Sequence, residues 1–365
     1  MAISIKTPAN YLQQAGVVRQ LGEYVAPSAR RVLLISGHTA WDKTGAAVAQ
    51  SLHSHNIVFE VAYQQGKCTL ETIQRLARQA ATLKAQAIIG IGGGVAMDTA
   101  KGVGEVAGRL PVIQLPTVAA TCAAWSPFSV LYDSRGAHCG TLPLQRYPLW
   151  ILVDTEMIAA APVRFLKAGI VDALAKWFEF TPYLRQGETD LGLSLQIQAA
   201  KMALEIFERD AEQALEDNRR AAVTPALARV IDAAIALAGL ANSVRDDSQR
   251  IGVAHAIHNS MTQHPEFDAW LHGEKVGYAL GVQAILQYEA AVERRPLLGW
   301  LERLAIPLTP EDLGIGDNAA LLKHIAAGVN IKPEARARLP FAVDEAHLAA
   351  ALLATRRQAR RAFSL

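Results

Sequence analysis

Three residues far apart in the sequence have the types needed to hold a catalytic metal ion: Asp172, His255 and His272. Asp172 lies in the otherwise apolar stretch GIVDALAKW, and a buried carboxylate needs a partner. His255 and His258 are three residues apart, so both lie on one face of a helix. One Asp and two His form a common ligand set that leaves a coordination position open for substrate. The pattern therefore indicates a catalytic metal centre.

The same residues also have a structural interpretation. Single histidines are most often core or surface residues bonded to the backbone, and Asp172 has Lys176 one helical turn away as a salt-bridge partner. The spacing alone leaves both interpretations open.

A glycine-rich turn has the position expected of a pyrophosphate-binding loop. A β-branched run at 87–91 leads into Gly92, Gly93 and Gly94, and the helix-like stretch VAMDTAK follows. Glycines let a phosphate approach the backbone, and the amides of a helix N-terminus attract its charge. We expect Asp98 in the first turn, capping amides or bonding a ribose or amide group. The run lacks the GxGxxG spacing, so a tight structural turn is the alternative.

A long loop of small and hydroxyl residues is expected after the next strand, at 116–132. Its sequence is PTVAATCAAWSPFSVLY, and Pro116 ends the strand before it. Its position beside the glycine turn favours a role in lining a nucleotide site over that of a simple connector.

The sequence that must position these residues shows two patterns of secondary structure, one on each side of about residue 160. Strand-like runs at 32–36, 57–61, 87–91, 112–115 and 150–153 alternate with helix-like stretches at 42–54 and 70–84. Such alternation predicts a parallel sheet that is covered on both faces and binds ligands at the carboxyl ends of its strands. After Pro162, helical spacing dominates at 164–182, 190–215, 219–244, 248–263, 273–294, 318–329 and 344–362.

We therefore predict an α/β plus all-α fold. Residues 1–160 would form a Rossmann-like dinucleotide-binding domain, and residues 161–365 an all-helical metal and substrate domain.

The amino-acid composition limits the kinds of binding partner and the cellular compartment that we expect. The 365 residues are 51% hydrophobic and 19% charged, with a net charge of +2 and no basic stripe for nucleic acid. Arg356, Arg357, Arg360 and Arg361 are interpreted as a solvated helix face. Three well-separated cysteines favour a reducing cytoplasm, and no signal peptide or membrane span is expected. We expect a cytoplasmic protein whose partner is a small-molecule substrate.

Five ordered motifs give the chain a resemblance to the iron-containing alcohol dehydrogenase superfamily, in its glycerol dehydrogenase branch. They are GIGGGVAMDTAK, PTVAATCAAWSPFSVLY, AGIVDALAKWFE, AHAIHN and LHGEKVGYALG, and they extend over nearly the whole chain. The resemblance implies the two-domain architecture described above, which dehydroquinate synthase shares. It also implies a homo-oligomer, since relatives commonly associate.

The resemblance assigns the metal ligands to Asp172, His255 and His272, with His258 supporting a ligand or relaying a proton. Lys176 occupies the position of a fourth ligand in the wider superfamily, so a three-ligand site is implied, usually for zinc, with Fe²⁺ as the alternative. The implied coenzyme contacts are Gly93, Gly94, Val95, Ala96 and Asp98 on the pyrophosphate side, and Thr117, Ala120, Ser126, Phe128 and Tyr132 on the nicotinamide side.

Two departures from the branch bear on specificity. Cys122 replaces the Asp that contacts the polyol in the STDAP sequence of glycerol dehydrogenases. Gly37, followed by His38, replaces the Asp that binds the adenosine ribose in NAD-preferring relatives. Without this Asp, no carboxylate would repel a 2′-phosphate, which favours NADP over NAD. His38 or Lys43 would then bind that phosphate.

Within the branch, the TCAAWSP loop is most similar to that of the bacterial hydroxycarboxylate dehydrogenase A type. This resemblance implies NADPH-dependent reduction of a small 2-oxo acid to a 2-hydroxy acid. The metal would polarise the carbonyl, the coenzyme would transfer a hydride, and water or His258 would supply the proton. Cys122 would face the substrate, and Arg250 is the candidate to bind its carboxylate.

Three other functions are weighed against this one. An NAD-dependent glycerol or other polyol dehydrogenase would use the same metal. A dehydroquinate synthase-like lyase would recycle its NAD and so show no net change in the coenzyme. A non-catalytic nucleotide-binding protein would have lost its metal.

Overall fold

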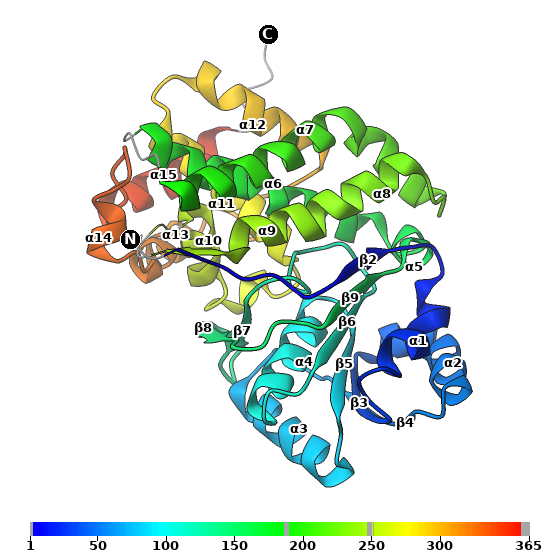
Figure 1. Cartoon of the computed structure of the whole chain (residues 1–365). Coiled ribbons are helices and arrows are strands. Elements are labelled where there is room, and N and C mark those ends of the chain that lie inside the picture. Colours follow the sequence, from blue (N-terminus) through cyan, green and yellow to red (C-terminus); the bar gives the residue numbers. More distant parts are fainter. Residues whose placement is uncertain (1–2, 186–189, 247–249, 251, 359–365) are drawn as a thin grey trace.

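The computed structural model describes residues 3–185, 190–246, 250 and 252–358. Six parallel strands form the central sheet in the order β2-β9-β6-β5-β3-β4 (Figure 1). They are β2 (Tyr11–Gln13), β3 (Arg31–Ser36), β4 (Val58–Tyr63), β5 (Ala87–Gly92), β6 (Val112–Pro116) and β9 (Trp150–Val153). The five strands expected from the sequence are confirmed, and β2 is an addition.

Helices cover both faces of this sheet (Figure 1). One face carries η1 (Val17–Gln20), α1 (Leu21–Val25) and α2 (His38–Ser54); the other carries α3 (Leu70–Leu83) and α4 (Gly94–Val106). Successive residues of β3 point into different cores: Leu34 packs in the core of α2, and Leu33 in the core of α3. Both faces are buried, which explains the nearly continuous apolar run of this strand.

The strand order creates a crevice at the carboxyl edge of the sheet. The chain runs from β3 to β4 on one side, then returns across β3 to β5 on the other, so the loops after β3 and β5 diverge. Such a switch point is where open parallel sheets bind their ligands. Gly37 follows β3, and Gly92 ends β5 with a φ of 147°, a conformation that favours glycine.

The C-terminal part is helical and lies against the carboxyl edge of the sheet (Figure 1). Its longer helices are α6 (Val163–Arg185), α7 (Leu191–Arg219), α11 (His272–Gln287), α12 (Ala291–Arg303) and α15 (Glu345–Gln358). The others are α5 (Thr155–Ala159), α8 (Pro225–Asp232), the π-helical turn η2 (Ala233–Leu237), α9 (Ala238–Ser243), α10 (Val253–Met261), the 3-10 turn η3 (Pro265–Phe267), α13 (Ala319–Gly328) and α14 (Pro333–Arg336). The predicted fold class is confirmed.

Two element predictions were wrong. The stretch 273–294 is not one helix, because Tyr288 is extended (φ −125°, ψ 122°) between α11 and α12. The stretch 116–132 is not loop throughout, because β7 (Phe128–Tyr132) pairs antiparallel with β8 (His138–Pro143). Small residues and Pro127 before β7 hid its short strand signal. A further short pair, β1 (Ile3–Ile5) with β10 (Val244–Asp246), joins the start of the chain to the helical part.

Among the described residues, one helical stretch, Pro225–Ser243, is long and apolar enough by composition to cross a membrane. Its most apolar 18-residue window is 61% buried inside the protein, as is usual for a helix in a protein core. Arg360 and Arg361, which were interpreted as a solvated helix face, lie outside the described residues.

Candidate active site

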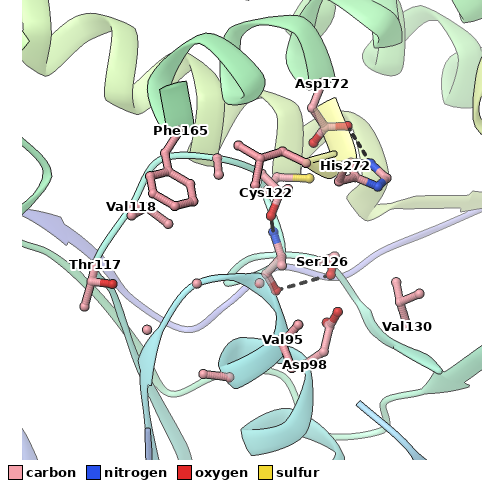
Figure 2. Close-up of a pocket in the computed structure, with 18 of the residues that line it drawn as sticks. Val95, Asp98, Thr117, Val118, Cys122, Ser126, Val130, Phe165, Asp172 and His272 are labelled. Carbon is pink, nitrogen blue, oxygen red and sulfur yellow. Dashed lines mark hydrogen bonds and ion pairs between the residues drawn. The ribbon is translucent and has the colours of Figure 1, made fainter. Parts of the chain in front are cut away.

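A cavity of about 1290 Å³ lies between the carboxyl edge of the sheet and the helical part. Every site residue expected from the sequence lines it. They are Gly37, His38, Gly93, Gly94, Val95, Ala96, Asp98, Thr117, Ala120, Cys122, Ser126, Phe128, Tyr132, Asp172, Arg250, His255, His258 and His272. Figure 2 shows the two sides of this cavity, with Asp172 and His272 on one and Val95 and Asp98 on the other.

Asp172, His255 and His272 converge on one point. They come from α6, α10 and the first position of α11. Oδ1 of Asp172 lies 3.2 Å from Nε2 of His255 and 3.3 Å from Nε2 of His272. One ligand atom from each residue lies within 4.8 Å of the other two. The structure thus assembles the metal-ligand set that the sequence predicts.

Glu179 fixes the orientation of His255. It lies on α6 two turns beyond Asp172, is buried, and its Oε2 is 2.7 Å from Nδ1 of His255. Its other oxygen accepts the backbone N–H of His255 at 2.9 Å. A carboxylate at Nδ1 places the ring proton there and leaves the lone pair of Nε2 pointing toward Asp172. The Glu179 carboxylate fits here because residue 252 is glycine. A Cβ at that position would lie only 2.3–2.5 Å from the carboxylate.

His258 does the same for His272. Its Nε2 is 3.1 Å from Nδ1 of His272, and its Nδ1 is 3.1 Å from Oδ1 of Asn259. Burial, and then the charges of His272 and Lys275, hold the pKa of His258 well below its ordinary value. A neutral His258 donates to Asn259 and accepts from His272, so the lone pair of Nε2 of His272 also points toward Asp172.

This donor set fits a divalent cation. One carboxylate oxygen and two imidazole lone pairs meet at hydrogen-bond distances, and the two ring protons already point to Glu179 and His258. Such a convergence of acceptors needs a positive centre. Burial would raise the pKa of Asp172, but Lys176 and the two histidines hold it well below its ordinary value, so the carboxylate is ionised.

Lys176 supplies part of that positive charge. Its Nζ lies 3.2 Å from Oδ1 of Asp172 and 3.2 Å from Nε2 of His255. Burial would lower its pKa, but Asp172, Cys122 and Glu179 together outweigh this and raise it, so the side chain is an ammonium. The salt bridge weighed as the structural alternative is therefore present beside the ligand set. An ammonium does not ligate, so Lys176 adds no fourth donor to the set of Asp172, His255 and His272.

Cys122 lies on the loop between the metal ligands and α4 (Figure 2). It is buried, and Nδ2 of Asn242 donates to its sulfur at 3.4 Å. Burial, and then the charge of Asp172, raise the pKa of the thiol to about 11. The side chain is therefore neutral at physiological pH.

Lys101 ties this loop to α4. Its buried Nζ donates to Oγ of Ser126 at 2.7 Å and to the carbonyl of Phe128 at 2.5 Å. It also pairs with Asp98 at 2.9 Å. The expectation that Asp98 lies in the first turn was wrong: α4 begins at Gly94, and Asp98 starts its second turn. Asp98 lines the cavity, but its carboxylate already has an ammonium partner.

Two glycines let the loop and α11 approach α6. A Cβ on Gly169 would lie 1.8 Å from the carbonyl oxygen of Ala119, and a Cβ on Gly273 would lie 2.0 Å from that of Ala168. Gly169 is three residues before Asp172, and Gly273 follows His272. These contacts bring the loop and His272 against the same helix.

The far end of the cavity is built around Gly37. This residue precedes α2, and no atom of the described residues lies within 4 Å of a Cβ added to it. The ring of His38 stacks on Tyr63 at the end of β4, with centroids 4.1 Å apart. Lys43, one turn further along α2, lines the same region.

Arg250 lines the cavity, but its guanidinium is engaged by protein groups. It binds Oδ2 of Asp190 at 2.9 Å and Oε1 of Gln196 at 3.2 Å. Much of its charge is therefore neutralised within the protein.

Sequence reasoning missed Glu179, Lys101 and Lys275. Each had a readable signal, because each lies on the helix face of a residue already singled out. Glu179 is seven residues after Asp172, and Lys101 and Lys275 are three after Asp98 and His272.

Comparisons with known proteins agree with this geometry. The family model for iron-containing alcohol dehydrogenase matches residues 8–155. Glycerol dehydrogenase of Escherichia coli O6:H1 is 34% identical over 96% of this chain and 95% of its own. Hydroxycarboxylate dehydrogenase A of E. coli K12 is 33% identical over 85% of each. The crystal structure of a probable glycerol dehydrogenase from Sinorhizobium meliloti 1021 superposes with a TM-score of 0.86 at 27% identity, covering 98% of this chain and 99% of its own.

A parallel-sheet cleft that opens onto an Asp and two His defines a metal-dependent, NAD-linked oxidoreductase acting on CH–OH or C=O groups. The chain belongs to the iron-containing alcohol dehydrogenase family and is similar to its glycerol dehydrogenases.

Replacing Gly252 with alanine tests how His255 is positioned. The new methyl would displace Glu179 and tilt the ring, so we expect zinc affinity to fall about 10- to 100-fold. Competition with a chromophoric chelator measures the affinity. Gly299→Ala is the matched control, because its added Cβ has no neighbour within 4 Å in the part of the chain that the structure describes. Equal zinc affinities in the two variants would refute the role given to Glu179.

Proposed function

We propose that the protein reduces a small 2-oxo acid to a 2-hydroxy acid with NADPH. The observation that carries the proposal is the neutral, buried thiol of Cys122 close to Asp172, where the branch has a polyol-binding carboxylate. A carboxylate there would repel an anionic substrate, whereas a thiol does not. The ammonium of Lys176 adds a positive charge beside the same ligands.

We assign the metal, zinc by preference, to Asp172, His255 and His272. A divalent metal held there would polarise the substrate carbonyl, and reduced nicotinamide would supply the hydride. The role of the chain is placement: Glu179 and His258 orient the two imidazoles through the hydrogen bonds described above.

We assign coenzyme binding to the cavity residues named from the sequence, from Gly37 and His38 to Tyr132. The pyrophosphate would lie at the backbone of Gly93 and Gly94, where α4 begins. The nicotinamide would lie along the Ser126 loop, which Lys101 holds in place. We also propose that the boundary between the α/β domain and the helical domain lies near residue 160. The protein would be located in the cytoplasm and would form a homo-oligomer.

Replacing Gly37 with aspartate tests the coenzyme assignment. Its φ of −77° and the free space around it accept a side chain without strain. The new carboxylate would repel a 2′-phosphate and accept a bond from a ribose 2′-hydroxyl. We expect the ratio of kcat/KM for NADPH over NADH to fall about 10- to 100-fold, which is about 1.4 kcal/mol per tenfold. Gly37→Asn is the uncharged control, and a wild-type preference for NADH would contradict the assignment.

The proposal is tested by a spectrophotometric screen of zinc-loaded enzyme. Small 2-oxo acids with NADPH or NADH are compared with glycerol and other polyols with NADP⁺ or NAD⁺. We expect the highest kcat/KM for a 2-oxo acid with NADPH. Faster polyol oxidation with NAD⁺ would support the dehydrogenase alternative. Turnover without a net change in coenzyme absorbance would support a lyase.

A further inference from the structure

Lys275 is a buried cation on the wall of the cavity. Only 5% of its surface is exposed, and it lies on α11 three residues after His272, so the two share a helix face. Its Nζ makes one long hydrogen bond, 3.4 Å to the carbonyl of Phe267. Among the described residues, no carboxylate oxygen lies within 4.0 Å of this ammonium.

The nearby acids do not compensate this charge directly. The carboxylate of Glu274, the adjacent residue, is held by Arg164 at 2.6 and 2.7 Å. Asp268 also lines the cavity, but its side chain is exposed to solvent and screened.

A second cation lines the same cavity from the α/β part. Lys67, on the segment between β4 and α3, has its Nζ 5.6 Å from the centre of the Tyr132 ring. Burial, and then the charge of Lys67, lower the pKa of Lys275 to about 8. The two ammonium groups thus make the electrostatic potential along one wall of the cavity more positive.

A buried ammonium without a counter-ion is costly, and an anionic ligand would offset that cost. Arg250 is the less suitable anion site, because Asp190 and Gln196 already bind its guanidinium. Lys176 is likewise held by Asp172. Of the two lysines that line this cavity and are buried, Lys176 and Lys275, Lys275 uses less of its hydrogen-bonding capacity among the described residues.

We propose that Lys275, supported by Lys67, binds the carboxylate of the substrate while the carbonyl faces the metal ligands. The proposal rests on the 2-oxo acid function given above and names the residue that selects an acid over an uncharged carbonyl. The short separation of Lys275 and His272 along α11 suits a substrate whose two functional groups are adjacent.

The test compares pyruvate with methyl pyruvate, its uncharged ester, in the zinc-loaded enzyme. Lys275→Met keeps an unbranched apolar side chain as far as Cε and removes the charged Nζ. We expect the KM for pyruvate to rise about 10- to 100-fold, while that for methyl pyruvate and for NADPH changes less than about threefold. Lys275→Arg should restore part of the loss. Lys323→Met, at an exposed position on α13, is the matched control.

Two readouts are independent of turnover. Calorimetric titration with oxamate, an unreactive pyruvate analogue, should show the same loss of affinity in Lys275→Met. The Tm of this variant should be equal to or above that of the wild type, because an unpaired buried charge has been removed. A lower Tm with equal losses for pyruvate and its ester would assign Lys275 a structural role and overturn the proposal.

The outcomes also separate this proposal from the proposed function. A wild type that reduces no 2-oxo acid would refute both. A wild type that reduces pyruvate, with a Lys275→Met variant that discriminates pyruvate from its ester as before, would refute only the role of Lys275. A Lys275→Met variant that weakens NADPH binding instead would place the coenzyme phosphates at this site, and would likewise overturn the proposal.

Discussion

Replacing Asp172 with asparagine is expected to abolish metal binding and to lower kcat/KM by about a thousandfold or more. Oδ1 of Asp172 is the atom that both imidazoles face, so its charge anchors the whole ligand set. A catalytic metal contributes several kcal/mol to transition-state stabilisation, and each 1.36 kcal/mol is a factor of ten in rate. Asparagine keeps the volume of the side chain and removes its charge.

Metal content by mass spectrometry, measured beside kcat/KM, checks this expectation. The same substitution leaves Lys176 without its buried partner, so circular dichroism must show that the variant is folded. Glu208→Gln, an exposed charge removal on α7, should retain both metal and activity. A folded Asp172→Asn protein with one zinc per chain and full activity would show that the ligand assignment is wrong.

Replacing Cys122 with aspartate is expected to exchange the substrate preference. The new carboxylate would lie in a buried position beside Asp172 and close to the proposed substrate. Burying like charges together costs several kcal/mol. We therefore expect kcat/KM for 2-oxo acid reduction to fall roughly 100-fold. The added acceptor should raise glycerol oxidation from its wild-type level.

Parallel assays of both reactions measure this exchange. Cys122→Ser is the control, because it changes the polarity of the position without adding a charge. Cys139→Ser, at an exposed cysteine, reports any general effect of thiol removal. If Cys122→Asp leaves the kinetics of both reactions unchanged, residue 122 does not determine substrate preference.

Much of this fold was readable from the sequence because its strong signals are local. The buried strands β3, β5 and β6 are short β-branched runs with clear stops, and each was predicted within two residues. The hairpin β7–β8 was missed because its pairing depends on contacts outside the local pattern. The break at Tyr288 was missed because the flanking residues continue the helical spacing.

The convergence of Asp172, His255 and His272 was predictable from residue type and from resemblance, but the partners of the groups around them were not. Glu179 reaches His255 across 76 positions in the sequence, and this pairing exists only once α6 and α10 pack together. The same holds for Lys275, whose lack of a carboxylate partner among the described residues becomes visible only in three dimensions. Arg250 shows the converse, since its partner Asp190 lies sixty positions away and changes what its charge can do.

The most direct test of the metal centre is anomalous diffraction at the zinc edge, on crystals of the zinc-loaded protein with NADP⁺. We predict one strong peak per chain, within coordinating distance of Asp172, His255 and His272. A fully active, zinc-containing protein whose peak lies away from these three side chains would contradict the account.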